Sequence, residues 1–469
     1  MRWLLFLLVL MFGGSVRAQV RTLSDSGRLV TIGRIILAGN KVTQDRIILR
    51  EMSLQTGDTI RKYQLASALS QEKKRIYNLR LFNRVDLEPL ELEPGRVDVL
   101  VEVQERWYTY PIPIFELSDR NFNEWWQNYD RDLSRVNYGL RLYQYNFRGR
   151  NETLKLTARF GFSKRFDLYY KLPNLGKNQK HGLLFEYVYS EPFNIAYRTD
   201  DHILTFIGAR KPLRRGNSFA TTYTFRKSFY RTHSLRAGYM DIGISDTIFR
   251  LNPGYLSQDR SQQFFTSLSY RFVAEHRDVI AYPLKGYFVT ATVTGVGLTP
   301  KEPARYLNFS GSFAWHRQVG DGLYFSLFSS VYANTNPRQP YAIISGLGYD
   351  RQYIRGYETY VIEGSVFSLN KVTLKKRILN REFPAVMRFN QFSQIPLAIY
   401  IKAFSDFGYV NNYPFYQTEF INTRLSNKPL AGAGFGIDFV SYFDSVLRLE
   451  YTFTSQATSG LFLNIKKEF

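Results

Sequence analysis

The side chain best placed to make a specific contact in this chain is an arginine in a loop. Arg355 precedes Gly356 in the stretch YIRGYE, residues 353–358, which follows a run rich in glycine and turn-forming residues. A guanidinium is always charged and offers a planar fork of donors that fits a carboxylate. Gly356 would let the chain turn tightly beside such a contact. Taken alone, however, an arginine in a loop is most often a solvated charge.

Residues that could carry out catalysis form no recognisable arrangement. The five histidines have no metal-site spacing, and the sequence contains no cysteine to serve as a nucleophile or thiolate ligand. No G-x-S-x-G nucleophile elbow is present. Gly432, Gly434 and Gly436 have the wrong spacing for a dinucleotide loop, and in a strand they predict a smooth inner surface. We therefore expect no enzyme activity, no cofactor and no metal.

The first residues, 1–18, predict a secretory signal peptide. Arg2 precedes an apolar run from Trp3 to Phe12, and Val16-x-Ala18 fits a cleavage site. We therefore expect an exported protein that is stable without disulfides.

The charge and aromatic content narrow the class further. The formal net charge is +22, and the chain has 38 Phe and 34 Tyr residues. A basic chain can bind nucleic acid, but these aromatic residues are spread along the sequence and are not clustered in a stacking motif. An exported chain rich in Tyr and Phe is typical of a membrane β-barrel with aromatic girdles. We expect no nucleic-acid partner.

Residues 29–106 have the pattern of a small α/β domain of order β-α-α-β-β. Residues 31–39 predict a strand, residues 43–52 predict a short helix, and a longer helical periodicity follows. Two strands, 82–89 and 95–105, complete the pattern, and the second alternates buried valines with other residues.

From Val136 onward, segments of about ten residues alternate with turns, as in a transmembrane barrel. One face of each segment is apolar and aromatic, and the opposite face is charged, as expected for a water-filled interior. A soluble β-sandwich also alternates, but its core faces would be mainly aliphatic. The sequence therefore predicts an all-β transmembrane barrel over residues 136–469, preceded by a connector over residues 107–135.

About sixteen antiparallel strands can be placed, the even number that such barrels require. The first covers residues 136–147, and another begins near residue 202. YIRGYE follows the eleventh strand in this count. With the N-terminal domain in the periplasm, it lies in an extracellular loop.

These features resemble the BamA-type superfamily of POTRA–β-barrel proteins (BamA/TamA-like), and the resemblance covers essentially the whole mature chain. Residues 29–106 look like one POTRA domain. The stretch Ile354-Arg355-Gly356-Tyr357 matches the family's V/I-R-G-F/Y motif, and Phe404-x-Asp406-x-Gly408 matches its F-x-D-x-G strand motif. The last strands also match, and the residues that form the C-terminal strand signal are Leu461, Leu463, Ile465 and Phe469.

The resemblance implies that the motif loop folds back into the barrel and that Arg355 meets Asp406 on the inner wall. Many members have a second acid on the strand after this loop, but here that stretch reads VTLKKRIL, with Lys375 near the place. Glu450 points into the barrel by its phase and is a candidate substitute. A single POTRA domain is also fewer than the several of the essential assembly factor, which suggests a smaller, specialised member.

The function implied is insertion or translocation of proteins at a bacterial outer membrane. The strand containing Phe82, Val85 and Leu87 would be an exposed edge that recruits an extended client. The barrel would act at the seam between residues 136–147 and 461–469. Expected partners are outer-membrane lipid and lipopolysaccharide, unfolded or secreted client proteins, and accessory lipoproteins or periplasmic chaperones. The alternative is a passive pore that uses its basic interior to admit anions.

Overall fold

The computed structural model describes residues 27–117, 136–257, 260–349, 352–384, 394–441 and 445–466. The predicted signal peptide and Phe469 lie outside these ranges. Within them, no helix combines the length and apolar character needed to cross a membrane.

The N-terminal domain is a four-stranded sheet packed against two helices. The sheet order is β2-β1-β4-β3, with β1 and β4 parallel and the other pairs antiparallel. Its elements are β1 (Leu29–Ala38), α1 (Asp45–Leu49), β2 (Thr59–Arg61), α2 (Lys62–Tyr77), β3 (Phe82–Glu93) and β4 (Arg96–Glu105). The predicted order is confirmed except for the three-residue strand β2, which is too short to show a periodicity in the sequence. The alternating valines of β4 and Leu65, Leu69 and Ile76 of α2 form the core of this domain.

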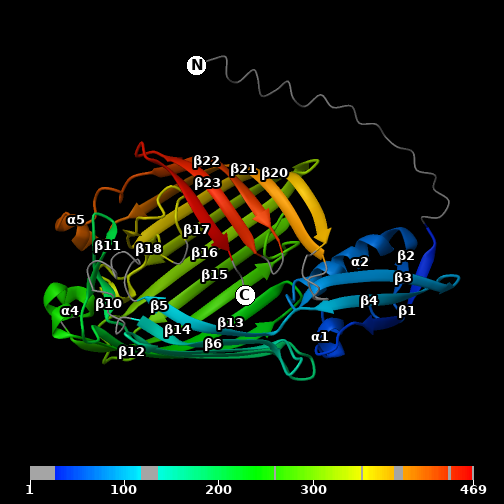
Figure 1. The fold of residues 1–469 in the computed structure, drawn as a ribbon, viewed down its shortest axis with the longest axis horizontal. Coiled ribbons are helices and arrows are strands. Elements are labelled where there is room, and N and C mark those ends of the chain that lie inside the picture. Colours follow the sequence, from blue (N-terminus) through cyan, green and yellow to red (C-terminus); the bar gives the residue numbers. More distant parts are fainter. Residues whose placement is uncertain are drawn as a thin grey trace, which may run out of the picture.

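The rest of the described chain is dominated by a single antiparallel sheet of sixteen strands. Figure 1 shows this barrel with the N-terminal domain at one end, which we call the near end. The strands, in sheet order, are β5 (Thr109–Leu117), β6 (Val136–Phe147), β7 (Glu152–Gly161), β8 (Lys164–Leu175), β9 (His181–Glu191), β12 (Arg214–Arg226), β13 (Arg231–Ile244), β14 (Gln262–Glu275), β15 (Gly286–Val296), β16 (Tyr306–Gly320), β17 (Leu323–Asn334), β20 (Val366–Pro384), β21 (Gln394–Asn411), β22 (Leu430–Val440), β23 (Val446–Thr454) and β24 (Ser459–Lys466).

The predicted strand number is confirmed, but two of the predicted positions are wrong. The stretch treated as part of a connector contains β5, which is the first strand of the barrel and pairs with β6. The strand expected near residue 202 is instead part of a separate hairpin formed by β10 (Asn194–Asp200) and β11 (Ile203–Gly208). Strand β5 was not predicted because it contains Pro111 and Pro113, and proline inside a strand pattern argues against a strand.

The two errors cancel from β12 onward, so the motif loop still follows the eleventh strand. They do not cancel earlier: the count made β6 the first strand, so the turn after it would lie at the same end as the loop after the eleventh strand, and this is wrong. Gly149 in that turn accepts a hydrogen bond from the backbone of Gln44, at 3.0 Å, so the turn lies at the near end against the N-terminal domain.

The loops at the opposite, far end carry most of the remaining structure. Figure 1 places α4 (Asp246–Leu251), α5 (Pro414–Thr418) and the β10–β11 hairpin there. Both helices are too short for an amphipathic periodicity, which explains why the sequence did not reveal them. The large apolar residues on the outward phase of the strands are exposed, as expected for a lipid-facing surface; they include Leu156, Phe160, Leu168, Phe219, Tyr239, Tyr451 and Phe453.

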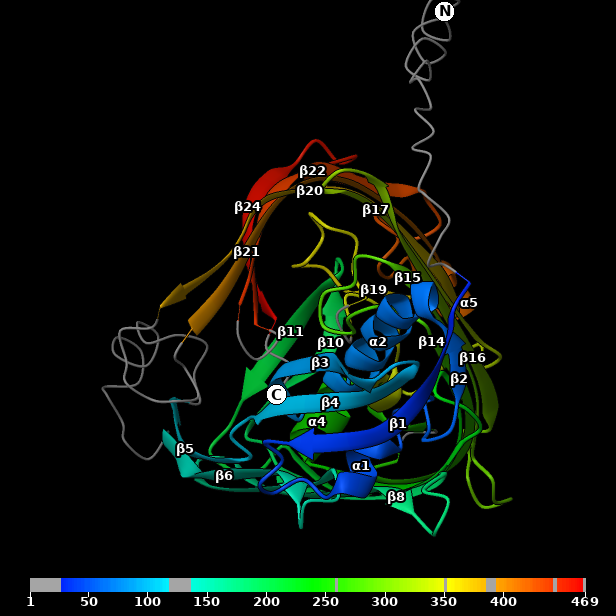
Figure 2. The same cartoon turned by 90° about the vertical axis from the view of Figure 1, so that its right-hand side faces the viewer.

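Among the described residues, no ladder joins β5 to β24, so these two strands are the edges of the sixteen-stranded sheet. Figure 2, viewed from the near end, shows the two strands apart on one side of the barrel and the N-terminal domain lying across its mouth. The seam is therefore β5 and β24. Strand β6, which the sequence assigned to the seam, is paired on both sides.

Candidate functional site

The loop between β17 and β20 turns back into the barrel and is buried there. Ile354 and Tyr357 are 1% and 2% exposed, and Arg355 between them is 8% exposed. Ile354 and Tyr357 belong to an apolar cluster with residues of β20 and β21, among them Leu369 and Val410. We call residues 352–361 the motif loop. Its burial makes the interpretation of Arg355 as a solvated charge wrong.

Arg355 and Asp406 meet on the inner wall, as the family resemblance implied. Arginine Nε and Nη2 donate to the two carboxylate oxygens of Asp406 at 2.9 and 2.5 Å. The backbone N–H of Arg355 donates to the same carboxylate at 3.0 Å. Asp406 on β21 is fully buried. A bidentate pair of this kind fixes both the position and the orientation of the loop.

Three further wall residues complete the arginine's surroundings. Its guanidinium carbon lies 3.8 Å from the centre of the Phe404 ring, which places the cation over the ring face. Nη1 lies 3.5 Å from Glu450 Oε1, and Nη2 donates to Thr373 Oγ1 at 3.1 Å. Glu450 therefore lies where it can serve as the second acidic partner of Arg355.

Glycines at the contact let the loop backbone approach the wall. Gly356 has φ of +94°, and a Cβ there would lie 2.5 Å from Thr454 Cγ2. A Cβ on Gly432 would lie 2.0 Å from the carbonyl oxygen of Arg355, and one on Gly408 would lie 2.5 Å from Ile354 Cδ1. Of the three glycines of β22 that predicted a smooth inner surface, Gly432 contacts the motif loop, whereas a Cβ on Gly434 or Gly436 would meet residues of β21 and β23.

Substituting Gly432 by alanine should displace the motif loop. The added methyl group would overlap a backbone oxygen, which cannot move as a flexible side chain could. We expect faster trypsin cleavage at Arg355 in the purified protein. Gly311→Ala is the matched control, because a Cβ at that strand glycine meets only ordinary contacts of 3.6 Å and more. Equal cleavage of the two variants would contradict the predicted packing.

The wall also holds a second ion-pair group that the sequence did not single out. Lys402 on β21 forms an ion pair with Asp438 on β22, and its Nζ lies 2.8 Å from Glu450 Oε1. All three side chains are at least 94% buried. Glu450 is therefore shared between Arg355 and Lys402. Lys375 faces the same region, with its ammonium 4.3 Å from the centre of the Tyr282 ring.

These contacts reach the near end of the barrel. The hydroxyl of Tyr282, in the turn between β14 and β15, donates to Asp438 Oδ2 at 2.8 Å. In the same turn, the carbonyl of Asp278 accepts a hydrogen bond of 3.0 Å from Asn78 of the N-terminal domain. A continuous series of contacts thus connects the N-terminal domain to the motif loop through the inner wall.

The other predicted site residues lie apart from this wall. Strand β3 is an edge of its sheet, but Phe82 and Val85 are 0% and 1% exposed and belong to the domain core, and Leu87 packs against that core. Their side chains are therefore not the contact surface, and the backbone of β3 is the edge that remains. On β24, Leu461 and Leu463 are exposed and face outward, and Ile465 lies on the same strand.

The N-terminal domain is fixed to the near end by specific contacts. Arg226 at the end of β12 donates to both carboxylate oxygens of Glu51, at 2.5 and 2.7 Å. Burial lowers the pKa of the neighbouring Arg50 to about 10, and the positive charge of Arg226 contributes to this. The described residues contain no cluster of histidine and acidic side chains that could hold a metal ion.

Comparisons with known proteins agree with this architecture. Residues 30–106 match the family model described as "POTRA: Surface antigen variable number repeat". CdiB from Escherichia coli is similar at a TM-score of 0.51 and 12% identity, over 94% of this chain and 75% of that one. BamA from Haemophilus ducreyi lacking POTRA domains 1–3 has a TM-score of 0.48 and 15% identity, over 95% of this chain and 82% of that one. A comparison with curated protein sequences finds no match. At these identities the likeness to CdiB concerns the fold alone.

Proposed function

We propose that this chain is a POTRA–barrel protein of the BamA type and that it inserts or translocates proteins at the bacterial outer membrane. The near end then faces the periplasm, with the POTRA domain, and the far end faces outside. Outer-membrane lipid and lipopolysaccharide surround the barrel, and extended client proteins are its substrates. Accessory lipoproteins or periplasmic chaperones would contact the POTRA domain.

The observation that carries this proposal is the seam, where β5 and β24 are edges of the sheet that pair with no other strand in the described part of the chain. An unpaired strand edge offers backbone donors and acceptors to another extended chain. A barrel that serves only as a pore gains nothing from such an edge, because closure is what satisfies its backbone in lipid. The seam thus supports a role in which a client strand pairs transiently with the barrel.

The pairing of β5 supports a weak seam. Tyr145 N–H donates to the Tyr108 carbonyl at 2.7 Å, and Thr109 is paired with Gln144. Backbone groups alternate in direction along a strand, so those of residues 109, 111, 113, 115 and 117 point away from β6, toward the free edge. Pro111 and Pro113 have no N–H to offer there. Continuous pairing with β24 therefore lacks two donors.

Restoring these donors should slow the insertion of client proteins. In the double variant Pro111→Val/Pro113→Val, β5 gains two N–H groups at its free edge and closes more firmly on β24. We expect the rate of client insertion into proteoliposomes to fall several-fold. Phe115→Val changes an exposed side chain on the same face of β5 without altering a hydrogen-bond donor, and it should behave as wild type. An unchanged rate in the double variant would mean that the prolines do not weaken the seam.

The POTRA domain supplies a second edge at the periplasmic side. Strand β3 is unpaired on its outer side among the described residues, and Pro89 lies within it, as is common on edge strands. A client strand added to β3 by backbone hydrogen bonds would be held directly below the barrel mouth (Figure 2). Recruitment at β3 followed by pairing at the seam is the order of events that we propose.

A passive anion pore fits the structure less well. The motif loop is folded into the barrel and buried against its wall, and the POTRA domain lies across the mouth. Both would obstruct a steady current of ions.

Depletion in the native bacterium tests the function directly. Quantitative proteomics of the outer membrane and the cell surface should show a subset of proteins reduced as the protein is depleted. An unchanged set of outer-membrane and surface proteins would contradict the proposal and favour the pore.

A further inference from the structure

The hairpin formed by β20 and β21 continues past its neighbouring strands at the near end. Strand β17 pairs with β20 only as far as Lys376, whereas β20 runs on to Pro384 and stays paired with β21. On the other side, β22 pairs with β21 only from Ala398 onward. We call residues 377–384 and 394–399 the extension. Its β20 part is about 26 Å long, at about 3.3 Å per residue.

The two faces of the extension differ in polarity. Residues directly opposite each other in the ladder share a face, and the outward face continues that of Leu374 and Ile401, which are exposed on the barrel wall. The outward face is made up of Leu379, Arg381, Phe383, Ile395, Leu397 and Ile399, and the inward face includes Asn380, Glu382 and Pro396. The lipid-facing pattern of the barrel therefore persists in the extension.

The apolar outward face is exposed in the part of the chain that the structure describes. Phe383 and Ile395, which face each other across the ladder, are 41% and 39% exposed. A two-stranded hairpin without a surface to pack on is at best marginally stable in water. The outward face of the extension therefore calls for a covering surface.

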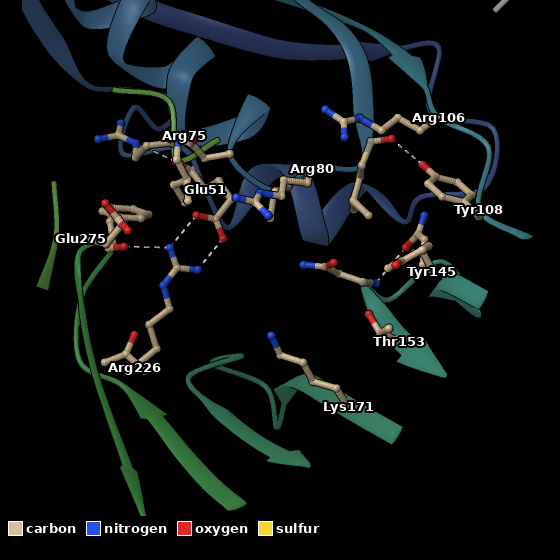
Figure 3. Close-up of a pocket in the computed structure, with 18 of the residues that line it drawn as sticks. Glu51, Arg75, Arg80, Arg106, Tyr108, Tyr145, Thr153, Lys171, Arg226 and Glu275 are labelled. Carbon is tan, nitrogen blue, oxygen red and sulfur yellow. Dashed lines mark hydrogen bonds and ion pairs between the residues drawn. The ribbon is translucent and has the colours of Figure 1, made fainter. Parts of the chain in front are cut away.

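The POTRA domain lies toward the other face. The pKa of Arg84 on β3 is raised most by Asp86, and the negative charge of Glu382 on the inward face also raises it. The domain is fixed to the barrel through other strands: Figure 3 shows Arg226 of β12 paired with Glu51. The POTRA domain thus leaves the outward face of the extension uncovered.

The edges of the extension are poorly suited to pairing with another strand. The register shifts between Arg377 and Leu379, which leaves an extra residue, Ile378, in a bulge. Pro384 and Pro396 lie in the two strands. Bulges and prolines are features by which natural edge strands avoid pairing with other chains. The face of the extension, and not its edge, is therefore the surface available to a partner.

The charges on the outward face suit a phospholipid surface. Lys376, at the boundary with the barrel wall, and Arg381 lie on the outward phase among apolar residues, and both are exposed. No acidic residue shares this face in the described part of the extension. Arginine and lysine next to exposed apolar side chains are typical of protein surfaces that lie in the interface of a membrane with anionic lipids.

We propose that the outward face of the extension lies in the headgroup region of the periplasmic leaflet, with Arg381 at the lipid phosphates. Continuity with the lipid-facing wall supports this occupant. Figure 2 shows the end of the hairpin on the same side of the barrel mouth as β5, so the contact would lie beside the seam. The inference takes from the proposed function only the assignment of the near end to the periplasm.

Lipid contact can be measured with a fluorophore at single cysteines. Phe383→Cys and Ile395→Cys, each labelled with the dye NBD, are reconstituted as full-length protein into phosphatidylcholine vesicles with or without brominated acyl chains. Glu382→Cys is the matched control, because it lies next to Phe383 on the opposite face. We expect bromine to quench the dye at least threefold more at residues 383 and 395 than at 382. Altered gel mobility before and after heating checks that each barrel is folded.

A second arm tests the charge. In vesicles containing phosphatidylglycerol, we expect the quenching at residue 383 to rise about twofold over pure phosphatidylcholine. Arg381→Gln should abolish this rise, since it removes the cation closest to the dye on that face. Arg210→Gln is the control, because Arg210 is an exposed arginine in a loop outside the extension, and it should leave the rise unchanged.

Equal quenching at residues 382, 383 and 395 would overturn the proposal. Shielding of residue 383 that requires a denatured client and is insensitive to bromine would also overturn it, and would identify a protein partner instead. A full rise in the Arg381→Gln protein would overturn the contact proposed for Arg381. The lipid assay contains no client. Strong quenching at 383 and 395 in a protein that inserts no client would therefore contradict the proposed function and leave this inference standing.

Discussion

An Arg355→Glu protein is expected to lose client insertion almost completely. The new carboxylate would lie between Asp406 and Glu450, two buried acids, with the ring of Phe404 beneath it. Breaking a buried ion pair by removing one partner costs about 3–5 kcal/mol, and reversing the charge adds repulsion. We therefore expect the motif loop to leave the wall while the barrel strands remain paired.

The measurement is the insertion rate in proteoliposomes, together with trypsin sensitivity of the motif loop. Adding Asp406→Arg should restore part of the activity, because it recreates the pair in the opposite sense. Arg338→Glu is the control, since Arg338 is an exposed arginine of the same far-end loop. A fully active Arg355→Glu protein would mean that the buried contact has no part in function.

Locking the seam is expected to stop insertion reversibly. The chain contains no cysteine, so pairs can be introduced without background. One cysteine would replace Ile112 or Ile114 of β5, and the other would replace Phe462 or Asn464 of β24. Oxidation, or a short cleavable linker, would then join the two edges, and a client strand could no longer enter between them. Reduction should restore the wild-type rate.

The matched control is a bridge within a ladder that is already formed. Ala237 and Leu268 face each other across β13 and β14, so joining them adds a cross-link without closing an edge. This variant should insert clients normally in both redox states. A locked seam that works as well as the open one would show that the barrel does not act through β5 and β24.

Much of the fold could be predicted because period-two alternation survives in most strands. The errors have physical causes. Pro111 and Pro113 made β5 difficult to recognise in the sequence, although an edge strand such as β5 tolerates proline. The β10–β11 hairpin alternates like a barrel strand, and alternation does not say which sheet a strand joins. The seam was misplaced as a consequence, since it depends on which strand comes first.

The site was predictable only in part. Arg355 and Asp406 were identified because each lies in a family motif. Lys402 and Asp438 belong to no motif, and their pairing depends on the register of β21 against β22, which alternation leaves open. One signal was present: Lys402, Phe404 and Asp406 share one face of β21, so Lys402 had to face the same interior. Phe82 and Val85 were assigned to a client surface because an edge strand was located without deciding which face packs on α2.

Insertion by the purified protein tests the proposed function most directly. Full-length protein in liposomes is mixed with a urea-denatured outer-membrane barrel, and folded client is followed by its altered gel mobility. We predict a rate well above that of empty liposomes, and a return to the background rate when residues 29–106 are deleted. No acceleration over empty liposomes, together with a large steady anion current that persists after this deletion, would contradict it.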